Sequence, residues 1–108
     1  MKLVSIQSPY KRNIEQNIAY ARRALHNSIL RGEAPFASHL LYTQVLRDDD
    51  PDERERALKC DHAFLVKCGL VAVYCDLGIT EGMELAISKA SELNILIEIR
   101  YIGVQQLP

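Results

Sequence analysis

The segment LVAVYC, residues 70–75, decides the fold class of this 108-residue chain. It is an unbroken apolar run with β-branched residues, which is typical of a parallel strand covered on both faces. The stretch GITEGMELAISKA, residues 78–90, follows it as a tight turn and a helix with Thr80 at the N-cap. A buried strand that leads directly into a helix predicts a βα unit of a parallel sheet.

The segments before this unit predict more strands and helices. Residues 2–7 alternate and form a first strand, and Pro9 ends it. Asn13 and Gln16 have capping-box spacing at the start of a helix over residues 13–31, with Gly32 at its C-terminal cap. The apolar face of this helix is predicted to contain Ile14, Ile18, Ala21, Leu25 and Ile29.

The middle and the end of the chain complete the pattern. Residues 33–37 form a short extended segment interrupted by Pro35, and SHLLYTQVL, residues 38–46, a short helix. Asp50 and Pro51 are an N-cap and a first helical residue, and this helix is predicted to end near Gly69. NILIEIRYIGV, residues 94–104, supplies the last strand. We therefore expect a single α/β domain over residues 1–108, a small parallel sheet of four or five strands flanked by helices.

Composition excludes several classes of function. The net charge is −1, from 13 basic and 14 acidic side chains, which argues against a general nucleic-acid binder. No apolar run reaches membrane-spanning length, and the N-terminus is too polar and short for a signal peptide. The cysteines form no CxxC pair and the histidines no metal-ligand spacing, so we expect reduced packing cysteines in a cytoplasmic protein without a metal.

Three polar loops follow predicted strands, at the edge of a parallel sheet where ligands bind. They are Ser8–Tyr10, Ser38–His39 and Asp76–Thr80. Each loop also has a purely structural interpretation: the first and third are common turns, His39 is a half-buried histidine, and Thr80 is an N-cap in either case. Likewise, DDDPDERER, residues 48–56, is a solvated helix start or an acidic rim over the site.

Four motifs together resemble the small nucleoside 2-deoxyribosyltransferase-like proteins of phages and bacteria. They are Ser8-Pro9-Tyr10, Asn17, Pro35 with His39-Leu40-Leu41, and Thr80-Glu81-Gly82-Met83, and the resemblance covers roughly residues 3–99. It implies a Rossmann-like (flavodoxin-related) parallel sheet, a homodimer or larger homo-oligomer, no cofactor, and cleavage of the N-glycosidic bond of nucleosides or nucleotides. In that family a glutamate early in the last major helix attacks the anomeric carbon.

That glutamate is missing here. The family pattern is Ser/Thr/Asp-x-Gly-x-x-x-Glu-[Ile/Leu]-x-x-Ala; Thr80 and Gly82 match its start, and Ile87 and Ala90 match its end. The nucleophile position is Ala86. Glu84 is two residues earlier, about 200° around the helix, and is expected to face solvent with Ser88 and Ser91.

The resemblance also implies which other residues of this chain bind the ligand. Thr80 matches a phosphate-binding serine, and Gly82 a glycine that lets the ligand approach the backbone. Asp61 matches a sugar-contacting aspartate, although the aspartate usual at the end of that helix is Gly69 here. Tyr10 and His39 are expected to flank a base or ribose. The predicted ligand-binding residues are Ser8, Pro9, Tyr10, His39, Asp61, Asp76, Gly78, Thr80, Glu81, Gly82 and Met83.

Three functions remain open from the sequence. The first is a nucleotide-binding protein without the nucleophile, either a phage-type sponge for a nucleotide signal, acting in the host cytoplasm, or a sensor. The second is an active N-glycosidase or 2-deoxyribosyltransferase that uses Glu84 or a nucleophile from a partner subunit. The third is a structural domain with a vestigial pocket.

Overall fold

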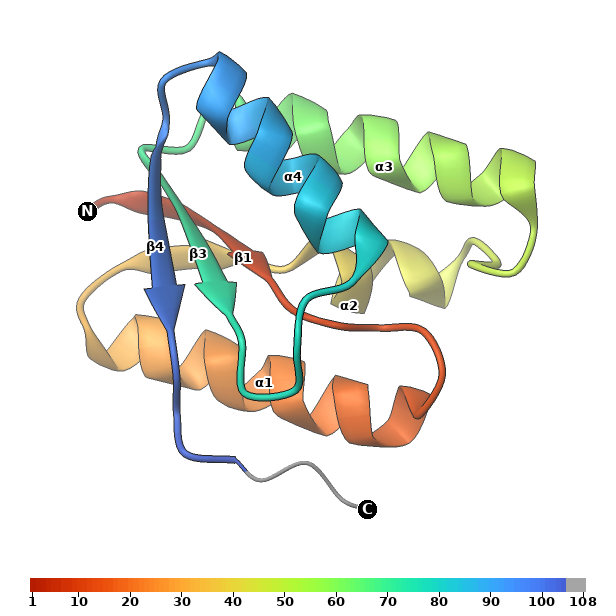
Figure 1. The fold of residues 1–108 in the computed structure, drawn as a ribbon, viewed down its shortest axis with the longest axis horizontal. Coiled ribbons are helices and arrows are strands. Elements are labelled where there is room, and N and C mark those ends of the chain that lie inside the picture. Colours follow the sequence, from red (N-terminus) through yellow and green to blue (C-terminus); the bar gives the residue numbers. More distant parts are fainter. Residues whose placement is uncertain (105–108) are drawn as a thin grey trace.

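A computed structural model describes residues 1–104 as four parallel strands between two layers of helices (Figure 1). This is the predicted α/β class. The strands run in the order β2-β1-β3-β4, with α1 on one face of the sheet and α3 and α4 on the other. The elements are β1 (Leu3–Gln7), α1 (Ile14–Leu30), β2 (Ala34–Phe36), α2 (Ser38–Leu41), a 3₁₀ turn (Tyr42–Gln44), α3 (Pro51–Leu65), β3 (Leu70–Tyr74), α4 (Glu81–Glu92) and β4 (Leu96–Arg100).

Strand β3 is the centre of the fold, as its apolar run predicts. All five of its residues are buried, and it pairs with β1 on one side and β4 on the other. Leu70, Ala72 and Tyr74 pack in the core under α1, whereas Val71 and Val73 pack against α3 and α4. Because both faces are covered, an alternating polar residue has no place in this strand.

The predicted apolar face of helix α1 is confirmed at Ala21, which is buried, and at Leu25, which packs against the core, but not at its two outer isoleucines. Ile14 and Ile29 are 45% and 56% exposed, and the buried residues are Asn17, Tyr20, Ala21, Ala24 and Ser28. Small side chains let the helix approach the sheet, and the buried polar groups have partners: Ser28, for example, donates to Glu33 at 2.8 Å. The predicted capping box is also wrong, because Asn13 occupies the N-cap position without a side-chain hydrogen bond.

Helices α3 and α4 begin at the residues that their sequences predict, whereas α3 and α2 end earlier than predicted. The Asp50 carboxylate accepts from the N–H groups of Asp52 and Glu53 at 3.0 and 3.1 Å, which confirms the start of α3. Thr80 caps α4 by accepting from the Met83 N–H at 3.3 Å. Helix α3 ends at Leu65 rather than near Gly69, and the helix predicted over 38–46 divides into α2 and the 3₁₀ turn.

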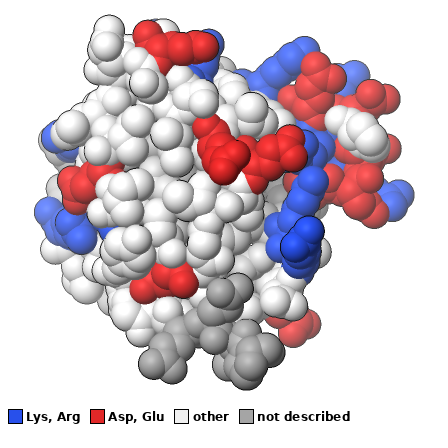
Figure 2. Space-filling view, viewed as in Figure 1, with Lys and Arg blue, Asp and Glu red and all other residues white. Residues whose placement is uncertain are grey.

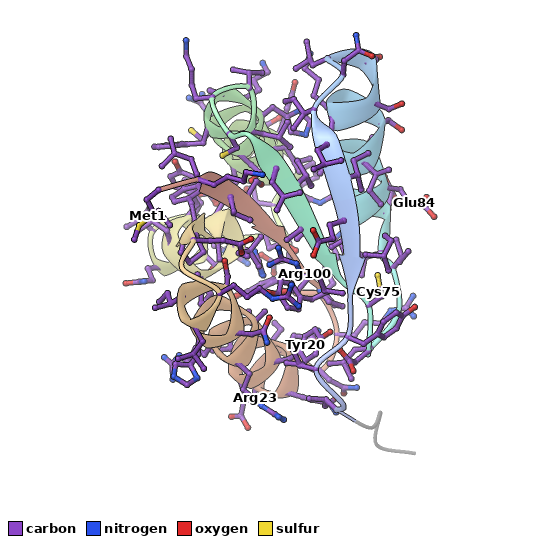
Figure 3. The ribbon with its side chains drawn as sticks, turned by 90° about the vertical axis from the view of Figure 1, so that its left-hand side faces the viewer. Met1, Tyr20, Arg23, Cys75, Glu84 and Arg100 are labelled. Carbon is purple, nitrogen blue, oxygen red and sulfur yellow. The ribbon has the colours of Figure 1, made fainter. Side chains whose placement is uncertain are left out.

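A buried ion pair ties β4 to the opposite side of the sheet. The Arg100 side chain is 2% exposed and contacts Glu33 at 2.7 Å and Glu98 at 2.8 Å. It also donates to the Tyr74 hydroxyl at 3.0 Å. Glu33 lies between α1 and β2, so this arginine fixes the edge strand to the first half of the chain. The view in Figure 3 shows Arg100 pointing back from β4 toward α1.

The cysteines within residues 1–104 are all free thiols. Cys68 and Cys75 are partly buried, whereas Cys60 is exposed, so its predicted packing role is wrong. None of the helices in this part of the chain has both the length and the apolar character needed to cross a membrane.

The last strand, β4, covers Leu96–Arg100 and is shorter than the predicted 94–104, because the backbone after Arg100 forms hydrogen bonds with the Asp76 side chain. The Asp76 carboxylate accepts from the backbone N–H groups of Ile102, Gly103 and Val104 at 2.8–3.2 Å, and from the Tyr20 hydroxyl at 2.6 Å. Burial alone would raise the pKa of this carboxyl, but these hydrogen bonds hold the pKa below its ordinary value.

We expect Asp76→Asn to destabilise the fold by about 1–2 kcal/mol at pH 7, because an amide cannot accept all of these bonds. A group with a lowered folded-state pKa stabilises the fold above its unfolded pKa, and this contribution disappears as the pH falls through the folded pKa. The difference from the parent in urea unfolding should therefore shrink below about pH 4. Asp49→Asn, at an exposed ion pair with Arg47, is the control and should have little effect. Equal stability of the Asp76 variant and the parent at pH 7 would contradict this account.

Candidate functional site

A cleft of about 550 Å³ lies beyond the carboxyl ends of β1 and β3. The connection from β1 runs through α1 to β2, on one side of β1, and the chain then returns over the opposite face of the sheet to β3, on the other side of β1. The order of the strands therefore reverses between β1 and β3. Ligands of open α/β sheets bind at such a switch point. The predicted residues that line the cleft are Ser8, Pro9, Tyr10, His39, Asp61, Gly78, Thr80, Glu81, Gly82 and Met83. Asp76 lies outside it, with its carboxylate engaged by Tyr20 and the segment after β4.

One side of the cleft floor is a hydroxyl–imidazole pair. Ser8, at the end of β1, is 6% exposed, and its Oγ lies 2.6 Å from Nε2 of His39 on α2. Burial lowers the pKa of His39 to about 4, so the ring is neutral at neutral pH. A neutral ring can donate or accept at Nε2, so the pair can present either a hydroxyl proton or an oxygen lone pair to a ligand.

The other side of the floor is a buried carboxylate. Asp61 of α3 is 6% exposed and accepts from the Ser38 hydroxyl at 2.7 Å and, at 3.4–3.5 Å, from the Gln7 amide. Gln7 also donates to Ser5 at 3.0 Å. Burial raises the pKa of Asp61 above its ordinary value, in spite of these hydrogen bonds. Three elements, β1, α2 and α3, therefore meet at one carboxylate.

The third wall is the N-terminus of α4. The Thr80 hydroxyl accepts from Met83 N–H and can still donate its own proton into the cleft. The first N–H groups of a helix have no partner within it, and together they favour an anion. Gly82 is in this first turn and lines the cleft.

The sequence prediction missed the cationic residues of the cleft. Arg54 of α3 lines it, and its Nη2 lies 3.9 Å from the point that a Cβ on Gly82 would occupy. No acidic side chain within residues 1–104 forms an ion pair with Arg54. Its seven-residue spacing from Asp61 places both on one face of a helix, which is the signal that could have found it.

The loop between β1 and α1 supplies two further cations, Lys11 and Arg12. Arg12 has a φ of 66°, an uncommon conformation for a residue with a side chain. The buried Asn17 amide holds the loop by donating to the carbonyls of Tyr10 and Lys11, both at 2.9 Å. Asn17 is part of the family resemblance, and here it acts on the loop backbone.

Neither the position at which the family resemblance expects a nucleophile, Ala86, nor the neighbouring Glu84 lines the cleft. Ala86 is fully buried beneath α4, in the core with Val71, Val73 and Met83. Glu84 is exposed, does not line the cleft, and points outward from α4 (Figure 3). Ser88 and Ser91 are exposed as well, as the helical spacing predicts.

The cleft combines an anion-receptive end, at Arg54 and the start of α4, with a polar floor at Asp61, Ser8 and His39. Tyr10 and Tyr42 add aromatic surface. Such a site suits a phosphorylated ligand with hydroxyl groups and a ring. In the part of the chain that the structure describes, no three histidine, cysteine, aspartate or glutamate side chains gather as metal ligands.

Comparisons with known proteins agree with this architecture. A model of the family described as a domain of unknown function (DUF7768) matches residues 2–101. No curated protein sequence matches the chain. Among solved structures, a 2-deoxyribosyltransferase from Bacillus psychrosaccharolyticus is similar with a TM-score of 0.66 at 10% identity, over 98% of this chain and 77% of that one. A CMP N-glycosidase from Clostridium botulinum is similar with a TM-score of 0.55 at 10% identity, over 95% of this chain and 91% of that one. At this identity the likeness establishes a nucleoside deoxyribosyltransferase-like fold.

Asp61 gives a test of the cleft floor. The pKa of Asp61 is higher in the folded chain than in the unfolded chain. Asp61 therefore stabilises the fold at a pH below its unfolded pKa, and this contribution to the free energy of unfolding is lost as the pH rises through its folded pKa. We expect Asp61→Asn to be at least as stable as the parent at pH 7, because the Gln7 side chain can turn so that its oxygen accepts from the new amide. The difference in stability between this variant and the parent should narrow below about pH 4, where the Asp61 carboxyl of the parent becomes protonated.

Asp61→Ala is the matched variant. It leaves the Ser38 and Gln7 donors without an acceptor and should cost about 1–3 kcal/mol. Thermal unfolding of the three proteins at pH 7 and pH 4 measures both effects. An Asn variant less stable than the Ala variant would contradict the hydrogen-bonding scheme.

Proposed function

We propose that this chain, which belongs to the DUF7768 family, binds a phosphorylated nucleoside in its cleft and does not cleave it. The observation that carries the proposal is the meeting of Arg54, Thr80 and Gly82 at one end of a cleft whose helix α4 has alanine at the nucleophile position. We further propose that residues 1–108 act as a single nucleoside 2-deoxyribosyltransferase-like domain.

The phosphate end of the ligand is assigned to the start of α4. A phosphate there would accept from the Thr80 hydroxyl and from backbone N–H groups of the first turn. The absence of a side chain on Gly82 supports close approach, and the Arg54 guanidinium beside it would pair with phosphate oxygens in a bidentate manner. A charge-assisted contact of this kind favours a nucleotide over a nucleoside.

The sugar and base are assigned to the floor and the aromatic wall. The Asp61 carboxylate has lone pairs left for a sugar hydroxyl after its bonds to Ser38 and Gln7. Tyr10 offers a face for a base, and the Ser8–His39 pair offers a polar group of either sense. The names of the two structural neighbours, a 2-deoxyribosyltransferase and a CMP N-glycosidase, support this class of ligand.

The absence of a carboxylate at position 86 supports binding over turnover. Double displacement at an anomeric carbon needs a carboxylate in line with the leaving base. Position 86 offers a buried methyl group, and Glu84 is exposed outside the cleft. The alternative of an active N-glycosidase or 2-deoxyribosyltransferase requires Glu84 to enter the cleft or a partner subunit to supply the nucleophile.

Capture without turnover suits a protein that holds a nucleotide signal in the cytoplasm. A phage-type sponge needs tight binding and no chemistry, and a sensor needs the same pocket with a response to occupancy. A structural domain with a vestigial pocket, by contrast, would bind no nucleotide saturably.

Thr80→Glu tests the phosphate assignment. A carboxylate at this position would repel a phosphate, so we expect affinity for nucleoside 5′-monophosphates to fall at least about tenfold in calorimetry, with little change for any weak binding of nucleosides. Thr80→Ser keeps the helix cap and should keep binding. Ser88→Glu adds the same charge on the exposed side of α4 and is the matched control. Unchanged affinity of Thr80→Glu would show that the phosphate site is misplaced. Release of free base that disappears in Glu84→Ala would contradict binding without cleavage.

Arg54→Ala tests the cation beside Gly82. We expect it to weaken nucleotide binding about tenfold, or roughly 1.4 kcal/mol, and to make the remaining affinity less sensitive to salt. Arg56→Ala removes an exposed arginine from the same helix and should leave binding unchanged. Equal effects of the two substitutions would indicate a nonspecific charge effect and reject a role for Arg54.

A further inference from the structure

The cleft has two walls, one on the α1 side of the sheet and one on the side of α3 and α4 (Figure 1). The wall on the side of α3 and α4 carries the proposed 5′-phosphate site. The other wall is formed by the loop between β1 and α1 and by the first turn of α1. Its cleft-lining residues, 9–13, 16 and 17, are called the loop wall below. The proposed function assigns no ligand group to the charged side chains of the loop wall.

The loop wall is the more electropositive of the two. It contains Lys11 and Arg12 and no acidic residue; Glu15, the nearest one along the chain, is exposed and does not line the cleft. Among the residues that the structure describes, no carboxylate forms an ion pair with either cation. The opposite wall contains Arg54 and three carboxylates, those of Asp48, Asp61 and Glu81. Figure 2 shows basic side chains over the loop, apart from the acidic side chains at the start of α4.

The backbone of the loop wall adds two free donors. The Asn17 side chain, which is 5% exposed, donates to the carbonyls of Tyr10 and Lys11, both at 2.9 Å. In a planar trans peptide the N–H points opposite to the C=O, so the N–H groups of Lys11 and Arg12 point away from Asn17. Neither N–H has a backbone acceptor within residues 1–104. Arg12 has a φ of 66°, and successive N–H groups in a turn with such a left-handed residue form a concavity that binds anions.

We propose that the loop wall binds a second phosphate group, so that the ligand is a ribonucleotide phosphorylated at the 5′ position and also at the 2′ or 3′ position. Lys11, Arg12 and their N–H groups offer this phosphate charge-assisted hydrogen bonds, which are roughly twice as strong as neutral ones. A nucleoside 5′-monophosphate leaves these donors to water. The inference rests on the proposed function, because it takes the 5′-phosphate to lie at the start of α4.

The chemistry of ribose limits the place of the second phosphate. With the 5′ oxygen at α4 and the base on C1′, the positions that remain are the 2′ and 3′ hydroxyls. One of them carries the phosphate toward the loop wall, and the other is left to donate to Asp61. A second phosphate on the 5′ phosphate itself would instead stay on the opposite wall, where the carboxylates of Asp48 and Glu81 would repel it.

Calorimetry of the full chain compares nucleoside 5′-monophosphates with the 3′,5′- and 2′,5′-bisphosphates of the same bases. We expect one of the two bisphosphates to bind at least about tenfold more tightly than the monophosphate. In the double variant Lys11→Gln/Arg12→Gln this preference should fall to about twofold or less, while the affinity for the monophosphate stays within about twofold of the parent. Both side chains are exposed, so the variant should fold like the parent, and urea unfolding checks this.

Two controls separate the loop wall from a general effect of charge. Arg22→Gln/Arg23→Gln also removes two positive charges, from exposed arginines of α1 that do not line the cleft, and should keep the preference for the bisphosphate. Nucleoside 5′-diphosphates carry their second phosphate at the α4 end, so their affinity should be the same for the parent and for the Lys11→Gln/Arg12→Gln variant.

The outcomes distinguish this inference from the proposed function. If no nucleotide binds, both are rejected. If monophosphates bind and Thr80→Glu weakens them, the proposed function stands, and equal affinity for the monophosphate and both bisphosphates then rejects the second phosphate site alone. A bisphosphate preference that survives in Lys11→Gln/Arg12→Gln rejects it too. So does an equal loss of affinity for monophosphate and bisphosphate in that variant, because the loop wall would then hold the 5′-phosphate.

Discussion

The buried carboxylate of Asp61 is the constraint on which the cleft depends. It receives Ser38 from α2 and Gln7 from β1, and it is carried by α3, so one side chain joins the three elements that form the floor. Ser38 and His39 are adjacent on α2, and Gln7 and Ser8 are adjacent at the end of β1; the Ser8–His39 contact therefore follows from the same arrangement. Burial raises the pKa of Asp61, which means that keeping it ionised opposes folding. In the proposed function, this carboxylate is held at the cleft to bind a sugar hydroxyl of the ligand.

The chemistry of the cleft follows from what surrounds this carboxylate. Lys11 and Arg12, from the loop between β1 and α1, and Arg54, from the start of α3, are the cations that line the cleft. The neutral His39 ring adds hydrogen bonding without charge. Helix α4 contributes its N-terminus and Gly82 to the cleft, whereas Ala86 of the same helix packs only in the core. A fold that elsewhere carries N-glycosidic chemistry is thus combined, in this proposal, with a site that holds its ligand and leaves the bond intact.

Local signals predicted much of this structure, and long-range partners account for the rest. The run at 70–75, the Asp50-Pro51 start and the Thr80 cap depend on neighbouring residues, and each formed where expected. The buried face of α1 was predicted only in part, because Tyr20 and Ser28 are buried with long-range partners, Asp76 and Glu33, which spacing along the helix does not reveal. Asp76 was expected at the ligand, but the chain returns to it 26 residues later, at Ile102. Arg54 was missed because its position beside Gly82 depends on how α3 and α4 pack. The loops that line the cleft were predictable from the strand ends alone.

Mass spectrometry of the intact protein tests the central claim most directly. The chain is incubated for hours with an equimolar panel of nucleoside 5′-monophosphates, and the complex and the solution are then weighed without denaturation. Binding without cleavage predicts one mass shift per chain, equal to an intact nucleotide, and no free base in the solution. A sugar phosphate attached to the protein, or free base in excess of the protein, would contradict the claim.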